Sequence, residues 1–431
     1  MIPQSPLTAW IERAIGVPPE PRLLIPWQMA RIRETLAHAK ANGPFYRERL
    51  AGCDPASIRT PGDLAALPFT TADDLRERAD DFLCVSQREI ARALTLQSSG
   101  TTGPAKRFFF TGEDLEATTD FFHHGISAFA GPGDKVCILM PGARPGTVGD
   151  LLSRALALLG ANGHVADLSL SVADMLDHMA AEGYAVAVCL PSQAIRLARA
   201  ARAQGRPRLV KTVLLGADHA AASLRAALEE DLCQRCVVHW GMSETCLAGA
   251  VECRAGRGCH IREADLFLEI IDPVSGKPCP DGVLGEIVLT TLSRLGMPLI
   301  RYRTGDLAAM DGAPCPCGSP LRRLTGFAGR LTDRASLPDG GTLSLAELDQ
   351  ALYRLPGLSG YTAAFGLDGE TARLDLAIEA AGQDASLLRD AGEAAAAVSG
   401  AKGVRIRLSA GPGEPQAAPL ANLAKRTLKR F

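Results

Sequence analysis

The 431-residue sequence has no stretch near the roughly 18 consecutive apolar residues that a membrane-spanning helix needs. Its first residues, MIPQSPLTAWIERAIG, lack the basic start and the apolar core of a signal peptide. An excess of charge is also missing, because the formal net charge is -2, which gives no general attraction to nucleic acid. We therefore expect a cytoplasmic protein that binds neither a membrane nor a nucleic acid.

Aromatic residues are scarce as well, at 5% of the chain, so composition does not identify a substrate pocket. Cysteine is plentiful, with 12 residues, but these are scattered through a long chain without a secretion signal. A disulfide framework is therefore not expected, and most of these cysteines are expected to be small buried apolar groups.

The order of strand-like and helix-like segments predicts an α/β protein. Residues 1–95 favour helices, as in WQMARIRETLAHAKANG, where apolar residues recur at helical spacing up to Gly43. From residue 96 to about 250, short apolar runs such as AVAVCL alternate with helix-like segments such as SVADMLDHMAAEG. This alternation indicates layers around a largely parallel sheet, which binds ligands where its strands end.

From residue 264 the pattern changes. The segment LFLEIIDPVSGKPCPDGVLGEIVLTTL is typical of two antiparallel strands joined by an Asp/Pro/Gly turn. A small Ala-rich α/β segment follows after about residue 329. The sequence therefore predicts a large N-terminal domain, residues 1–328, made of layered α/β subdomains plus a β section. A small C-terminal α/β domain, residues 329–431, follows it.

The segment LQSSGTTGPAKRFFFT, residues 96–111, is the first candidate for chemistry. Successive backbone N–H groups of a Gly-rich turn form an anion site, and hydroxyl groups and Lys106 add further donors. It is not a P-loop of the GxxxxGK[ST] type, because Arg107 follows Lys106. By itself the segment leaves two interpretations equally open, a phosphate-binding loop and an exposed hairpin turn.

Four further motifs occur in order along the chain: WGMSET (240–245), RYRTGDL (301–307), GRLTDR (329–334) and NLAKR (422–426). With the Gly-rich segment, this set resembles the adenylate-forming superfamily of acyl-CoA synthetases, luciferases and peptide-synthetase adenylation domains. GPFYRERL, LPFTTADDLR and CPCGSPLRRLTGFAGR are similar to the phenylacetate–CoA ligase branch. The resemblance implies an N-terminal adenylation domain and a mobile C-terminal domain.

The resemblance also implies a reaction. ATP and a carboxylic acid give an acyl-adenylate and pyrophosphate, and the CoA thiol then gives the thioester and AMP. Catalysis would depend mainly on charge placed around the phosphates. The expected partners are a small carboxylic acid, ATP and CoA, with Mg²⁺ as a cofactor, and relatives that are often dimeric leave a homodimer open.

Matching motifs assign residues to the nucleotide. The β- and γ-phosphates would be bound by Lys106 together with Ser98, Ser99, Gly100, Thr101, Thr102 and Gly103. The adenine and the α-phosphate would be contacted by Gly216, Ala217, Asp218, Trp240, Gly241, Met242 and Ser243.

Other assignments concern the metal, the ribose and catalysis. Glu244 would hold Mg²⁺, a hard ion that prefers carboxylate and phosphate oxygens. Asp306 would accept hydrogen bonds from the ribose hydroxyls, and Arg330 would lie near the ribose and phosphates. Lys425, Lys106 and Glu244 are the expected catalytic residues. Lys425 follows Ala424 where the family often has Gly, and Lys402 and Lys429 are nearby alternatives.

The acid would bind near Gly241 and the segment FFHH, where Phe122 and His123 are the expected contacts. Aromatic runs of this kind also serve as ordinary core. At the hinge the family usually has Asp two positions after the Arg, whereas this chain has Thr332. The Gly-Val-Asn-like segment with which the family helps to place CoA is also missing after this hinge.

Two cysteine clusters predict a structural zinc site. Cys253 and His260 lie in ECRAGRGCH, and Cys315 and Cys317 lie in CPCG, so four thiolate or imidazole ligands are available for a tetrahedral ion. The antiparallel strands expected between residues 260 and 315 would bring the two ends together. Many relatives of the branch resemble this chain at these four positions, and Cys259 is an alternative to His260.

We therefore expect an AMP-forming acid–CoA ligase acting on an aryl-acetate-like or other small acid. The altered hinge keeps an alternative open, an adenylate-forming enzyme with another acceptor, such as an adenylyltransferase or an enzyme that loads a protein thiol. A degenerate nucleotide-binding regulator is a third hypothesis.

Overall fold

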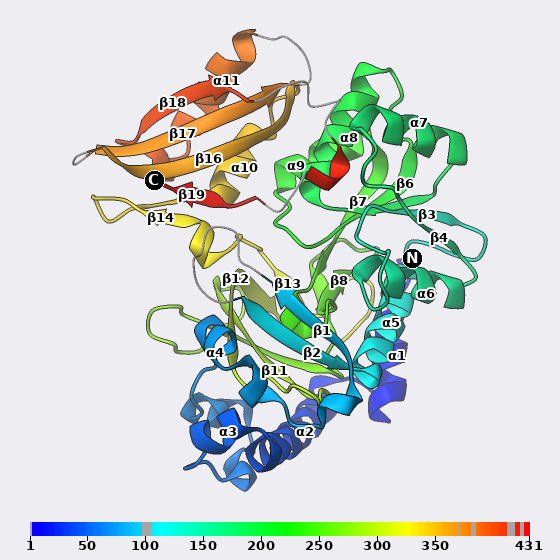
Figure 1. Cartoon of the computed structure of the whole chain (residues 1–431), viewed down its shortest axis with the longest axis vertical. Helices are drawn as coiled ribbons and strands as arrows, with labels where there is room; N and C mark the ends of the chain where they lie inside the picture. The colour runs from blue at the N-terminus through cyan, green and yellow to red at the C-terminus, as the bar shows by residue number, and fades with distance from the viewer. Residues whose placement is uncertain (1, 97–104, 369–370, 381–384, 412–418, 423–425) are drawn as a thin grey trace. The chain divides into compact units, whose positions relative to one another are not determined.

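The computed structural model describes residues 2–96, 105–368, 371–380, 385–411, 419–422 and 426–431. Contacts divide the chain into two compact units: Met1–Ala128 with His239–Phe327, and Phe129–Val238 with Ala328–Phe431. Each unit is built from segments far apart in the sequence (Figure 1). The division of the chain into domains 1–328 and 329–431 stays a prediction.

The described part of the first unit contains five α-helices, whose ends follow local sequence signals. Pro21 begins the long second helix at a position where its missing N–H costs nothing, and Gly43 ends it. Thr111 and Asp114 form a capping box at the start of the fifth helix. The helices are α1 (Pro6–Ile15), α2 (Pro21–Asn42), α3 (Pro44–Arg49), α4 (Ala72–Glu77) and α5 (Gly112–Ile126).

The first unit also contains antiparallel strands. One antiparallel pair consists of β1 (Ile90–Leu96) and β2 (Lys106–Thr111), with Leu96 opposite Lys106. A sheet has the order β10-β11-β12-β13-β9-β8. Its strands are β8 (Ala250–Glu252), β9 (Cys259–Ile261), β10 (Leu266–Ile271), β11 (Gly285–Thr291), β12 (Tyr302–Asp311) and β13 (Arg323–Thr325).

The second unit begins with the parallel sheet. Its strand order is β4-β3-β5-β6-β7, with helices between successive strands (Figure 1). The strands are β3 (Lys135–Ile138), β4 (Asn162–Val165), β5 (Val186–Cys189), β6 (Val210–Leu215) and β7 (Cys233–Trp240), whose last two residues belong to the first unit. The helices are α6 (Val148–Leu158), α7 (Val172–Glu182), α8 (Pro191–Ala203) and α9 (Ala222–Asp231).

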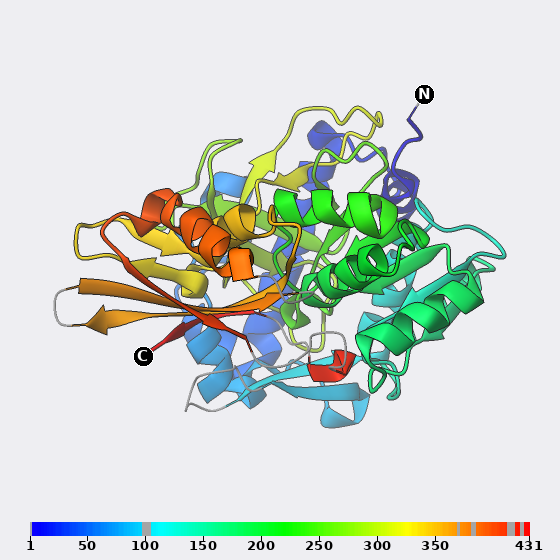
Figure 2. The same ribbon diagram turned by 90° about the horizontal axis from the view of Figure 1, so that it is seen from above.

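The C-terminal part of the second unit has a four-stranded sheet, β18-β17-β16-β19, with α11 on one face (Figure 2). The helices α8 and α9 pack against β16 and α10, so one hydrophobic core serves both parts. The elements are β14 (Arg334–Ser336), β15 (Thr342–Ser344), α10 (Leu345–Leu352), β16 (Leu358–Asp368), β17 (Thr371–Ala380), α11 (Ala385–Ala396), β18 (Arg405–Ala410) and β19 (Leu428–Arg430).

The predicted α/β fold class is confirmed, including the alternating parallel section and the later antiparallel section. The segment WQMARIRETLAHAKANG is helical up to Gly43 as predicted, and the helix α2 that contains it begins earlier, at Pro21, and includes Pro26. Among the described residues, every helix is too short or too polar to cross a bilayer.

Candidate active site

Lys106 and Glu244 meet in the first unit. Lys106 begins β2, and Glu244 lies in the short 3-10 turn Ser243–Thr245 that follows β7. The Lys106 Nζ lies 2.5 Å from Glu244 Oε1, and the Tyr302 hydroxyl donates to the same oxygen over 2.9 Å. The structure therefore brings together two of the three predicted catalytic residues, which are 138 positions apart.

The Glu244 carboxylate is only 2% exposed, and burial by itself raises the pKa of a carboxyl group. The Lys106 ammonium and the Tyr302 hydroxyl more than offset this effect, so the pKa of Glu244 lies below its usual value. Glu244 is therefore a buried anion whose charge is balanced by Lys106. An anionic oxygen of this kind is suited to a hard divalent cation.

The turn that carries Glu244 is held tightly. A Cβ on Gly241 would lie 2.4 Å from the Leu247 carbonyl oxygen, so only glycine fits there. The Met242 N–H donates to the Thr245 hydroxyl over 3.1 Å. These contacts explain locally why the motif WGMSET has glycine and threonine at these positions.

Arg294 anchors the same turn from another segment. Its Nη1 donates to the Glu244 carbonyl oxygen over 2.7 Å, and its Nη2 donates to the Phe109 carbonyl oxygen on β2 over 3.3 Å. Sequence reasoning missed Arg294, which lies in no recognisable motif. It also assigned no role to Tyr302, although RYRTGDL contains that residue.

Trp240 and Asp306, both assigned to the nucleotide, also meet. The Trp240 indole Nε1 donates to Asp306 Oδ2 over 3.0 Å. Trp240 is 7% exposed, and Asp306 lies on β12.

The predicted acid contacts are only partly brought together. Phe122 on α5 is buried, with its ring centroid 5.9 Å from that of His239, and Gly241 borders the same imidazole. His123 is less buried, and its ring lies beside that of His124. Sequence reasoning missed His239, whose pKa burial lowers to about 4.

Four of the predicted nucleotide contacts lie in the second unit. Gly216, Ala217 and Asp218 follow β6, and Ala217 adopts a left-handed backbone with a φ of 68°. Asp218 Oδ2 accepts a hydrogen bond from the Arg426 backbone N–H over 3.1 Å. Arg330 precedes the short 3-10 helix Leu331–Asp333.

Several predicted residues lie outside the described residues: Lys425 and the Gly-rich segment Ser98, Ser99, Gly100, Thr101, Thr102 and Gly103. Their assignments stay predictions.

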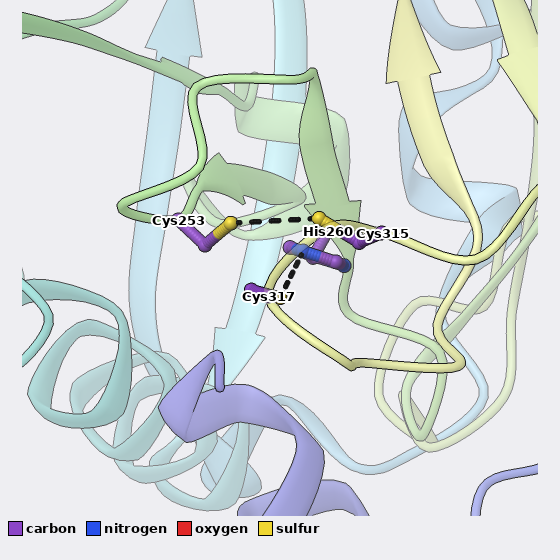
Figure 3. A group of neighbouring side chains, drawn as sticks. All are labelled: Cys253, His260, Cys315 and Cys317. Carbon is purple, nitrogen blue, oxygen red and sulfur yellow. Dashed lines mark hydrogen bonds between the residues drawn. The ribbon is translucent and has the colours of Figure 1, made fainter. Parts of the chain in front are cut away.

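The four predicted zinc ligands form one buried cluster (Figure 3). Their potential ligand atoms lie within 4.8 Å of one another. The sulfurs of Cys253 and Cys315 are 3.7 Å apart, and Cys317 Sγ is 3.6 Å from His260 Nε2. The antiparallel register places His260 on β9 opposite Arg323 on β13, which brings the two motifs together as predicted.

The protonation of the cluster reflects its burial. Burial lowers the pKa of His260 to about 4, so its imidazole is neutral, and burial raises the pKa of Cys253 to about 12. Burial acts in the same direction on Cys317, but the backbone N–H groups of Ser319 and Ser5 bring its pKa below the usual value. Two or three thiols and a neutral imidazole are the donor set of a structural zinc site. In the described cluster the imidazole of His260, rather than Cys259, faces the other three.

The fold of this chain is shared with solved structures of known enzymes. The fold is that of adenylate-forming CoA ligases: the chain is similar to 2-hydroxyisobutyryl-CoA ligase in complex with 2-HIB-AMP, with a TM-score of 0.77 and 21% identity over 94% of this chain and 88% of that one. It is also similar to the anthranilate CoA ligase AuaEII, with a TM-score of 0.55 and 15% identity over 76% and 65% of the two chains.

The model of the AMP-binding enzyme family matches residues 30–293, and the chain belongs to this family. It is 30% identical to the phenylacetate-coenzyme A ligase of Thermus thermophilus, over 76% of this chain and 75% of the relative. It is 32% identical to the enzyme of the same name from Pseudomonas putida, over 71% and 70% of the two chains. The resemblance to the phenylacetate–CoA ligase branch is thus confirmed.

Proposed function

We propose that this AMP-binding enzyme is an AMP-forming acid–CoA ligase that activates an aryl-acetate-like or other small carboxylic acid. One observation carries the proposal: Lys106, Glu244 and Tyr302 converge in a chain whose relatives are CoA ligases. In the first half-reaction the acid attacks the α-phosphorus of ATP and releases pyrophosphate. In the second, the CoA thiol attacks the acyl carbon and AMP leaves.

The residues of the first unit support the first half-reaction by placing charge. Lys106, at the end of the Gly-rich segment, would bind the β- and γ-phosphates and stabilise the departing pyrophosphate. Tyr302 and Arg294 hold the carboxylate and the backbone of Glu244 in place. Trp240, Gly241, Met242 and Ser243 would contact the adenine and α-phosphate.

Magnesium fits Glu244, because a buried carboxylate that stays charged can share a hard ion with substrate phosphates. The ion would offset negative charge on the phosphates. Asp306 and Arg330 would bind the ribose and phosphates, and Lys425 would bridge the acid and the α-phosphate.

Zinc fits the cluster of Cys253, His260, Cys315 and Cys317. Its positive charge would favour the ionised thiols that burial disfavours. Four protein ligands leave no open position, so the role would be structural. Location in the cytoplasm, and assembly as a homodimer, also stay predictions.

A panel of carboxylic acids, with pyrophosphate release measured with and without CoA, tests the proposal. We expect acid-dependent release of pyrophosphate, stoichiometric consumption of CoA and formation of AMP. Release without CoA consumption would support the alternative of a different acceptor. No release with any acid would overturn the proposal and favour a nucleotide-binding regulator.

A further inference from the structure

The hydrogen bond between Trp240 and Asp306 joins two residues whose predicted roles are separate, adenine for one and ribose for the other. The donor is the indole Nε1 and the acceptor is Asp306 Oδ2, at 3.0 Å. The two residues are 66 positions apart, so tertiary structure alone creates the pair. An indole has a single N–H donor, and here it is directed at this carboxylate.

Asp306 projects from a local distortion of β12. The register shifts between Glu286 and Val288 of β11, so the segment Thr304–Asp306 lies opposite Ile287 alone. The Thr304 hydroxyl donates to the Ile287 carbonyl oxygen over 2.7 Å and accepts the Asp306 N–H over 3.1 Å. A bulge of this kind re-aims a side chain, and the hydroxyl fixes the backbone beneath it.

The indole ring is fixed as well. A Cβ on Gly249 would lie 2.5 Å from Cε3 of the Trp240 ring, so the ring lies directly against the backbone of a glycine. With the ring held there, the direction of its N–H is set by packing. The bond from the indole N–H in turn restricts rotation of the Asp306 carboxylate about its side-chain bonds.

We propose that Trp240 is a positioning residue for ribose recognition, which it supports by holding the carboxylate of Asp306 through the indole N–H. This inference rests on the proposed function, in which Asp306 accepts hydrogen bonds from the ribose hydroxyls. A carboxylate accepts about four hydrogen bonds, so the bond from the indole does not exhaust its capacity. A carboxylate held in advance loses less conformational entropy when the nucleotide binds.

The test replaces Trp240 by phenylalanine, because W240F keeps an aromatic ring and removes the N–H. Calorimetry measures the affinities of ATP, 2′-deoxyATP and 3′-deoxyATP, each with magnesium. We expect the wild type to bind ATP about tenfold more tightly than either deoxynucleotide, the size of one well-made hydrogen bond. W240F should lose most of this preference, because its affinity falls for ATP and changes little for the deoxynucleotides.

Trp10 provides a matched control. Its Nε1 donates to Asp120 Oδ2 over 2.5 Å, and it is 6% exposed, so W10F removes a similar Trp–Asp bond elsewhere in the unit. We expect W10F to keep the preference for ATP over both deoxynucleotides. A loss of preference in both variants would overturn the proposal, because it would reflect a general loosening of the unit.

Other outcomes would also overturn the proposal. If W240F weakens ATP and both deoxynucleotides equally, the ring acts only on the adenine and the proposal is wrong. Should W240F fail to fold, the nucleotide affinities of the wild type and of D306N still test the proposal. Equal wild-type affinities, or an unchanged preference in D306N, would overturn the proposal. A wild type that binds no ATP would overturn the proposed function as well, whereas ATP binding without ribose preference overturns only this inference.

Discussion

At the scale of single residues, Glu244 shows how burial and charge combine. Its carboxylate is buried, which disfavours ionisation, yet Lys106 and Tyr302 keep it charged. Removing the charge of Glu244 would therefore leave the Lys106 ammonium without the carboxylate that it pairs with.

We predict that Glu244→Gln lowers the rate of pyrophosphate release by at least about 100-fold, the effect typical of losing one electrostatic contact to the reacting groups. The Tyr302 hydroxyl can still donate to the amide oxygen, so the variant should fold. A coupled assay of pyrophosphate release measures the effect. Glu113→Gln, an exposed carboxylate of α5, is the control and should keep wild-type activity. Retained activity in Glu244→Gln would remove this residue from the metal site.

At the scale of secondary-structure elements, the short strands β9 and β13 decide the geometry of the cysteine cluster. Pairing of His260 with Arg323 places the imidazole near the turn that carries Cys315 and Cys317. Successive residues of a strand point to opposite faces, so Cys259 and His260 have different surroundings although they are adjacent.

We predict about one equivalent of zinc per chain, measured by elemental analysis of the purified protein. Cys315→Ser should lose most of this zinc and lower the unfolding temperature, because binding energy of a structural ion is folding energy. Cys259→Ser is the matched control and should keep the metal. A wild-type chain that is folded but contains no zinc would contradict this prediction.

At the scale of the whole molecule, half-buried histidines link stability to pH. Burial lowers the pKa of His239 from 6.5 to about 4, and it lowers the pKa values of His124 and His219 as well. Below pH 6.5 the unfolded chain binds protons that the folded chain does not, so stability falls as the pH falls toward 4.

We predict that His239 alone costs about 2 kcal/mol of folding stability between pH 7 and pH 5. Urea unfolding at the two pH values measures the loss, and His239→Phe should reduce it. If the wild type and this variant lose the same stability over this range, the imidazole of His239 is not held neutral by burial.

The sequence by itself determined the fold class and the family, because alternating apolar runs and ordered motifs are local patterns. The strands AVAVCL and LVKTVLLG and the helix SVADMLDHMAAEG lie where periodicity predicts them. The sequence also showed the residues that we assign to phosphate, ribose and zinc in the proposed function, since Lys106, Glu244, Asp306 and the cysteine motifs stand in recognisable motifs.

Only the tertiary structure decided which side chains meet. No local pattern predicts that Tyr302 donates to Glu244, that Arg294 holds the same turn, or that Trp240 donates to Asp306. The contact between Trp240 and Asp306 also depends on the shifted register of β11 and β12 and on Gly249, which lets the ring approach the backbone. Such relations arise from packing between distant segments, and local propensity carries no information about them.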